Sequence, residues 1–147
     1  MTLRTGHIGL NVTDLDRSLA FYRDVLGFVL VSEGKEEGRR YAFLGDGERL
    51  VLTLWQQAGQ PYDGERAGLH HLALEADSIE RVREYEEALR AYGADFAYEG
   101  VVAHREGAAS GGIFFHDPDG TRLEISVPSG AEGAPVPHES APTCGFF

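Results

Sequence analysis

The 147-residue sequence contains one cysteine, Cys144, and no apolar run of the ~18–20 residues that a membrane-spanning helix needs. A single cysteine excludes an internal disulfide and any zinc site built on several thiolates. A bound metal would therefore be held mainly by His, Asp or Glu side chains. No apolar stretch behind a basic start follows Met1, so the sequence has no recognisable secretory signal and a cytoplasmic location is expected.

Positive charge is also scarce, because 13 Lys and Arg residues stand against 24 Asp and Glu residues, for a net charge of −11. A surface of this charge repels the phosphates of nucleic acids and anionic membranes, so neither is expected as a partner. The content of 42% apolar and 25% charged residues is that of a globular protein. A small molecule remains as the expected partner.

An internal repeat organises the chain. Residues 6–12 and 70–76 have the same alternation of apolar and small residues, which places His7 over His71. Apolar residues at helical spacing follow each segment, and they predict helices that end at Gly27 and Gly93. Each half therefore begins with a strand that leads into a helix.

A second match predicts the rest of each half. Asp46-Gly47 and Asp119-Gly120 lie 73 residues apart, and each pair joins two runs with strand character, as in a hairpin. Each half then contains one strand, one helix and three further strands. The strands are expected near residues 6–12, 28–33, 39–45, 48–55, 69–76, 95–100, 112–116 and 121–127.

The predicted fold is α+β, with two βαβββ modules in one domain at residues 1–128. Module one covers about residues 3–55, residues 56–68 are the linker, and module two covers about 69–128. Residues 129–147 form a tail rich in Pro and Gly, which is expected to be extended and anchored by Phe146 and Phe147.

Three residues can form a metal site. His7 and His71 share one position of the repeat, and Glu124 alternates onto one strand face with Arg122 and Ser126. If that face lines a cavity between the modules, two imidazoles and one carboxylate converge there. This donor set suits a divalent first-row metal and leaves positions open for substrate or water.

Plainer interpretations exist for the same residues. A strand histidine is more often a hydrogen-bonded core or rim residue than a ligand, and Glu124 can be paired with solvent or with Arg122. His70 is expected to point away from His71 by strand alternation, and the other histidines, His104, His116 and His138, are expected at the surface.

Three segments resemble the vicinal oxygen chelate superfamily, the glyoxalase/bleomycin resistance protein/extradiol dioxygenase family. They are GHIGLNVTDLDRSLAFYRDVLGF at residues 6–28, LHHLAL at 69–74 and HDPDGTRLEI at 116–125. The resemblance implies paired βαβββ modules that form a curved mixed sheet around a metal and substrate cleft. It also implies a homodimer, with modules paired within one chain or between chains.

The same resemblance implies that His7, His71 and Glu124 bind a divalent ion, with Fe, Mn, Zn, Ni and Co all open. Glyoxalase I has a further Glu ligand at the module-one equivalent of Glu124, and the 73-residue offset puts Val51 there. Because valine cannot bind a metal, true glyoxalase I activity is not expected.

Other subfamilies differ at single positions. Fosfomycin thiol transferases have a Thr and a Tyr where this chain has Gly9 and Phe114. Ring-cleaving dioxygenases use a further His and Tyr near the substrate, and His104 and Tyr98 are candidates for these roles. The general base is not identified by any motif.

The sequence is therefore interpreted as a metal-dependent enzyme acting on a small substrate with vicinal oxygens, as a dioxygenase, lyase or thiol transferase. The alternative is a metal-free binding or sequestration protein of the bleomycin-resistance type, in which Trp55, Phe43 and Phe114 line the cup. A weaker alternative is an interaction protein that uses the tail as its contact segment. Because bleomycin-binding members lack the metal ligands, the three retained residues favour the enzyme.

Overall fold

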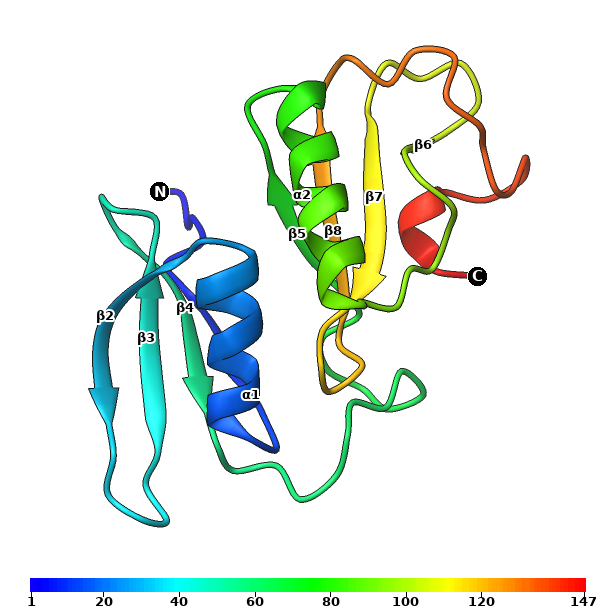
Figure 1. Ribbon diagram of the computed structural model, residues 1–147. Helices are drawn as coiled ribbons and strands as arrows, with labels where there is room; N and C mark the ends of the chain where they lie inside the picture. The colour runs from blue at the N-terminus through cyan, green and yellow to red at the C-terminus, as the bar shows by residue number, and fades with distance from the viewer. The chain divides into compact units, whose positions relative to one another are not determined.

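Two four-stranded sheets, each with one helical segment, make up the computed structural model, which describes residues 1–147 (Figure 1). The chain divides into two compact units, Met1–Tyr62 and Asp63–Phe147. The first unit contains β1 (Ile8–Asn11), α1 (Leu15–Leu19) with its π-helical continuation η1 (Ala20–Val25), β2 (Val29–Gly34), β3 (Tyr41–Gly45) and β4 (Leu50–Trp55). The second contains β5 (Leu72–Glu75), α2 (Ile79–Tyr92), β6 (Val102–Ala103), β7 (Gly111–His116), β8 (Arg122–Val127) and the 3-10 turn η2 (Thr143–Gly145).

The two sheets have the same strand order. It is β1-β4-β3-β2 in the first unit and β5-β8-β7-β6 in the second. In each sheet the first strand of the module pairs parallel to the last, and the other pairs are antiparallel. This confirms the predicted α+β class and the two βαβββ modules, while the single domain at residues 1–128 stays a prediction.

Local signals define the helix ends. The carboxylate of Asp14 accepts a hydrogen bond from the Arg17 amide at 3.1 Å, and the hydroxyl of Ser78 accepts one from the Arg81 amide at 3.2 Å. Helix α2 ends at Gly93, whose φ of +89° is in the left-handed region that glycine favours. No helix is long and apolar enough to cross a membrane.

Each sheet buries one face against the helix of its own unit. Leucines from β3 and β4 of the first unit are fully buried with two aromatic residues of η1: Leu44, Leu52, Leu54, Phe21 and Tyr22. Each such side chain contributes about 1.5–3 kcal/mol when it is removed from water. Strand alternation sends the intervening residues, among them Phe43 and Trp55, to the other face, where they are half-buried.

The strand predicted at residues 95–100 is wrong in position. In that segment only Phe96 forms an isolated bridge, with Phe115 on β7, and the edge strand of the sheet is β6. Gly100 separates the two pieces with a φ of +62°, a conformation that no extended strand has. The irregular backbone, rather than the side-chain pattern, therefore decides where the edge strand begins.

Strand register corrects the equivalence of the two modules. Gly9 pairs with Thr53 across β1 and β4, as Ala73 pairs with Glu124 across β5 and β8. Thr53, and not Val51, is thus the module-one equivalent of Glu124. The register between β3 and β4 shifts at the turn end of β3, whereas β7 and β8 pair without a shift, so the hairpin offset does not apply within the sheet.

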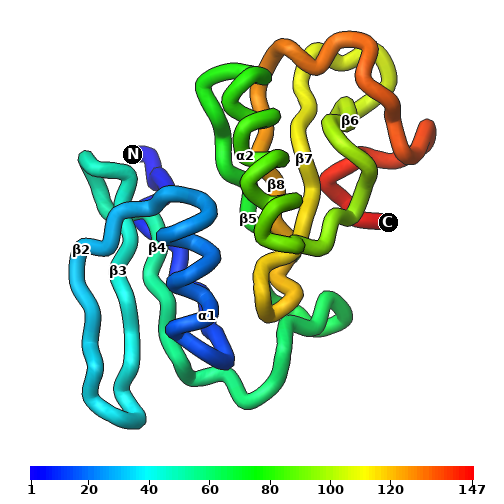
Figure 2. Tube along the Cα trace, viewed as in Figure 1, coloured from blue at the N-terminus to red at the C-terminus, as the bar shows by residue number.

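The C-terminal tail folds against the second unit. In Figure 2 the red C-terminal segment lies beside β6, and the Ala103 amide donates to the Pro135 carbonyl at 2.9 Å. The fully buried Thr143 donates its hydroxyl to the Ala103 carbonyl at 2.6 Å and its amide to the His104 carbonyl at 3.1 Å. The tail is therefore hydrogen-bonded to the edge of the second sheet. It contains the turn η2, so it is not extended along its whole length as expected.

Only one of the two terminal aromatics anchors the tail as expected. The ring of Phe146 packs 5.5 Å from that of Phe114 and 5.7 Å from that of His71, measured between ring centroids. Phe147 is 75% exposed, so the expectation that both rings pack is wrong for this residue. The end of the chain is held through its backbone instead, because the Phe147 carbonyl accepts hydrogen bonds from His138 Nε2 at 2.9 Å and from the Tyr98 hydroxyl at 3.5 Å.

Replacing Thr143 with Val should lower the free energy of unfolding by about 1–2 kcal/mol, because a buried carbonyl loses its donor while the side-chain volume is kept. Urea unfolding followed by circular dichroism measures this change. Thr2→Val is the matched control, since Thr2 is exposed. Equal unfolding midpoints for the two variants would show that the hydrogen bond from Thr143 to Ala103 contributes nothing to stability.

Candidate metal centre

Glu124 lies in the middle of the second sheet. It belongs to β8 and is paired with Ala73 on β5 and with Phe114 on β7. Its neighbours Leu123 and Ile125 are buried on the opposite face, so alternation turns the carboxylate to the face that the tail covers. The Glu124 side chain is only 6% exposed.

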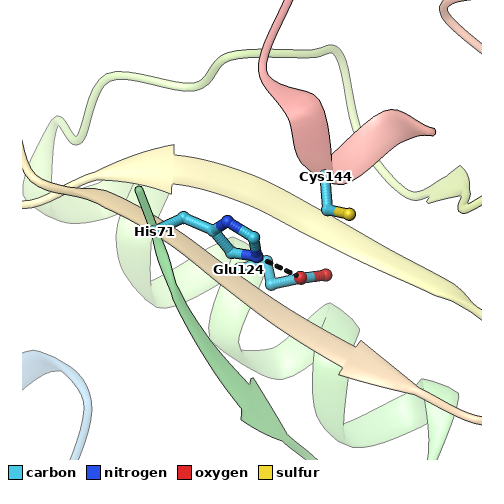
Figure 3. A group of neighbouring side chains, drawn as sticks. All are labelled: His71, Glu124 and Cys144. Carbon is cyan, nitrogen blue, oxygen red and sulfur yellow. Dashed lines mark ion pairs between the residues drawn. The ribbon is translucent and has the colours of Figure 1, made fainter. Parts of the chain in front are cut away.

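Two imidazoles surround this carboxylate. Nε2 of His71 lies 3.2 Å from Oε1 of Glu124, and Nε2 of His104 lies 2.9 Å from Oε2. A buried carboxylate is costly unless it is paired, and here both oxygens have a partner. Figure 3 shows the imidazole of His71 beside the Glu124 carboxylate. The partners of the buried charge are thus metal-binding side chains and not a Lys or Arg.

The orientation of His104 is fixed from both ends of its ring. Its Nδ1 lies 2.9 Å from the hydroxyl of Ser110, in addition to the contact of Nε2 with Glu124. A neutral imidazole with its proton on Nε2 satisfies both contacts, because it donates to the carboxylate and accepts from the hydroxyl. This tautomer is inferred from the hydrogen-bond network. His104, expected at the surface and as a substrate-binding candidate, therefore positions the Glu124 carboxylate.

His70 does not point away from His71. The two Nδ1 atoms lie 2.9 Å apart, so one ring donates to the other. The expectation is wrong because strand alternation applies only within a strand, and both residues precede the first residue of β5. The contact leaves Nε2 of His71 directed at Glu124.

Cys144 is a member of this group that the sequence did not identify. One ligand atom each from His71, Glu124 and Cys144 lie within 4.8 Å of one another. Figure 3 shows the thiol entering from the tail, a different segment from β8, which carries Glu124, and from His71 at the start of β5. No spacing motif marks this cysteine, because its place depends on how the tail folds back.

The other metal candidate, His7, lies in the first unit. It is exposed and directly precedes β1. Phe43 and Trp55 belong to the same unit, where their rings are 5.8 Å apart and both contact Tyr41 at 5.3 Å. These predicted site residues form an aromatic cluster on the half-buried face of the first sheet.

The remaining substrate candidates lie in the second unit near the carboxylate. Phe114 is fully buried beside Glu124, and the ring of Tyr98 packs edge-on against it at 5.6 Å. The Tyr98 hydroxyl donates to the Thr143 carbonyl at 3.3 Å. Burial raises the pKa of Tyr98 above its ordinary 10.0, and the charge of the Cys144 thiolate adds to this effect.

The donor atoms in the second unit fit a divalent first-row metal. Two ligands held about 2.0–2.1 Å from a tetrahedral ion are about 3.3 Å apart, close to the 3.2 Å that separates His71 Nε2 from Glu124 Oε1. Imidazole, carboxylate and thiolate are all ligands of Zn, Fe, Co and Ni. A cation between them would also neutralise the buried charge of Glu124.

Two βαβββ modules, the second with a carboxylate between two imidazoles, define a two-module protein with a candidate metal centre. The chain belongs to the glyoxalase/bleomycin resistance protein/dioxygenase superfamily, whose family model matches residues 4–125. The resemblance to the vicinal oxygen chelate superfamily is thereby confirmed.

Individual relatives agree with this assignment. The chain is 37% identical over 128 residues to a lactoylglutathione lyase of Haemophilus influenzae, covering 81% of this chain and 88% of the relative. A glyoxylase/bleomycin resistance protein/dioxygenase domain from Frankia sp. EAN1pec has a TM-score of 0.72 at 25% identity and covers 86% of this chain and 98% of that domain. These relatives support an enzyme of the superfamily.

A further solved structure shares the fold. The fosfomycin resistance protein FosX from Listeria monocytogenes, complexed with Mn(II) and sulfate, has a TM-score of 0.65 at 21% identity. The likeness covers 90% of this chain and 98% of FosX. At this identity the likeness concerns the fold.

Because the pKa of Tyr98 is raised in the folded state, its contribution to stability is present below pH 10.0 and is lost as the pH rises through the folded-state pKa. Tyr98→Phe should therefore lose less stability than the wild type between about pH 9 and pH 11. Urea unfolding across this range measures the difference. Tyr92→Phe, at an exposed tyrosine, is the control, and an identical alkaline loss in both variants would contradict the expected shift.

Proposed function

We propose that this protein is a metal-dependent enzyme that acts on a small substrate with two neighbouring oxygens, with a divalent ion held by His71, Glu124 and His7. The observation that carries the proposal is the buried carboxylate of Glu124, with His71 Nε2 at 3.2 Å and His104 Nε2 at 2.9 Å. A buried acid paired with imidazoles costs stability without an obvious structural benefit, as expected of a ligand site.

The proposed role of His7 is supported by the register of the two sheets. His7 precedes Gly9 by two residues and His71 precedes Ala73 by two, and these two small residues occupy equivalent places opposite β4 and β8. The two histidines therefore have equivalent positions in the two modules. We propose that the protein is a homodimer. In it, His7 joins the His71 and Glu124 either of its own chain or of the second copy.

The residues of the second unit have distinct proposed tasks. When bound, the ion would supply Lewis-acid stabilisation of negative charge on the substrate oxygens. His104 holds Glu124 in place through Nε2, and Ser110 fixes the tautomer of His104. Tyr98 offers apolar surface to the substrate, as Phe43 and Trp55 do in the first unit, whereas the fully buried Phe114 supports the Tyr98 ring from below.

The proposed reaction is not that of glyoxalase I, although a lactoylglutathione lyase is among the relatives. The position equivalent to Glu124 in the first module is Thr53, whose hydroxyl is neutral and accepts a hydrogen bond from the Trp55 indole at 2.9 Å. A dioxygenase, a lyase of another kind or a thiol transferase fits the donor set. Fe, Mn, Zn, Ni and Co remain candidates, and Mn(II) is the ion in the FosX structure.

The proposal also includes a cytoplasmic location and a small-molecule partner. The net charge of −11 supports neither nucleic acid nor an anionic membrane as a partner.

The proposal predicts that a compound with two neighbouring oxygens binds the metal-loaded protein at least about tenfold more tightly than the metal-free protein, a difference of 1.4 kcal/mol. Acetohydroxamate, catechol and hydroxyacetone would be titrated by calorimetry into both forms. His71→Ala and Glu124→Ala should abolish the difference, whereas Glu75→Ala, at an exposed acid on β5, should keep it.

Equal affinity of all three compounds for the loaded and metal-free forms, unchanged in His71→Ala, would contradict the enzyme proposal. The metal-free binding or sequestration protein would then be the better account, because burial of aromatic surface does not depend on a metal.

A further inference from the structure

The C-terminal segment holds Cys144 firmly in place. Thr143, directly before it, is fully buried and is bonded through its hydroxyl to Ala103 and through its amide to the His104 carbonyl. On the other side, the ring of Phe146 packs on His71. The cysteine is therefore fixed between two anchored residues, one of them bonded to the backbone of His104.

The backbone of this segment is strained in a way that the packing must offset. Phe146 is the only non-glycine residue with a positive φ, at 56°. Bulky residues rarely adopt this conformation, which persists only where the surroundings enforce it. The ring contacts of Phe146 with Phe114 and His71, and the guanidinium of Arg122 at 5.7 Å from its ring, provide that enforcement.

The thiol lies where a metal ligand would be. The ligand atoms of Cys144, His71 and Glu124 are within 4.8 Å of one another, with the Cys144 side chain half-buried (Figure 3). Ligands held about 2.0–2.3 Å from one tetrahedral ion are about 3.3–3.7 Å apart, so the thiol would move toward the other two ligands by up to roughly 1 Å on binding. No other cysteine exists in the chain to compete for this role.

We propose that Cys144 is a ligand of the metal, so that the C-terminal tail supplies a thiolate to the site formed by His71 and Glu124. This inference rests on the proposed function and extends it by one residue and one segment. The second unit then provides three different donor atoms, a nitrogen, an oxygen and a sulfur, by itself. A thiolate favours Zn, Co and Fe over Mn or Mg, and its binding releases the thiol proton to solvent.

The single cysteine allows a direct spectroscopic test. The full-length protein would be titrated with Co²⁺, and thiolate-to-cobalt charge transfer would be followed in the near ultraviolet. We expect the band in the wild type and its complete loss in Cys144→Ser and Cys144→Ala. Both variants should also bind Co²⁺ at least about tenfold more weakly, because losing even a residue that only hydrogen-bonds to a metal ligand weakens metal binding by this much. Ser140→Ala, at an exposed position of the same tail, should retain the band and the affinity.

Thiol modification gives a second measurement that does not depend on the charge-transfer band of cobalt. Loading with Zn²⁺ should slow the reaction of Cys144 with Ellman's reagent in the wild type. The same loading should have no effect in Glu124→Ala, where the ligand set is broken but the tail anchors remain. An equal rate with and without Zn²⁺ in the wild type would overturn the proposal.

The outcomes separate this inference from the proposed function. Tight Co²⁺ binding without a charge-transfer band, unchanged in the Cys144 variants, would overturn the thiolate ligand and leave the His71 and Glu124 site intact. Failure of every variant and of the wild type to bind Co²⁺ would overturn the proposed function and the inference with it.

Discussion

The contact between the buried carboxylate of Glu124 and the two imidazoles of His71 and His104 is the constraint on which the second unit depends. A charge that is 6% exposed must be compensated, and every compensating group comes from a different part of the chain. His71 precedes β5, while His104 follows β6 and is held in turn by Ser110. The sheet, its edge and its entry loop are thus arranged around one acidic side chain.

The two modules share a fold but use equivalent positions differently. Where the second sheet has Glu124, the first has Thr53, whose hydroxyl is bonded to the Trp55 indole. The face that carries histidine and carboxylate in the second unit carries the aromatic side chains of Tyr41, Phe43 and Trp55 in the first. The second unit supplies most of the proposed ligands, and the first supplies His7 together with a half-buried aromatic surface. This asymmetry suits an enzyme that binds both a metal and an organic substrate.

Much of the fold could be predicted from the sequence because its signals are local. The cap at Ser78 and the glycine stop at Gly93 mark helix α2 through bonds and dihedral angles of neighbouring residues. The edge strand β6 and the register of Thr53 could not be predicted, because a positive φ at Gly100 and a register shift between β3 and β4 decide them. Cys144 was missed for a related reason, since only the folded tail brings it to Glu124.

The most direct test of the metal centre is an anomalous X-ray measurement on crystals of the protein purified without chelators, with data collected on both sides of the absorption edges of Mn, Fe, Co, Ni and Zn. The account predicts one anomalous peak within about 2.0–2.3 Å of His71 Nε2 and a Glu124 oxygen, and the edge at which it appears would identify the ion. Crystals that bind Zn²⁺ or Mn²⁺ only at other places, with the His71 to Glu124 contact unchanged, would contradict it.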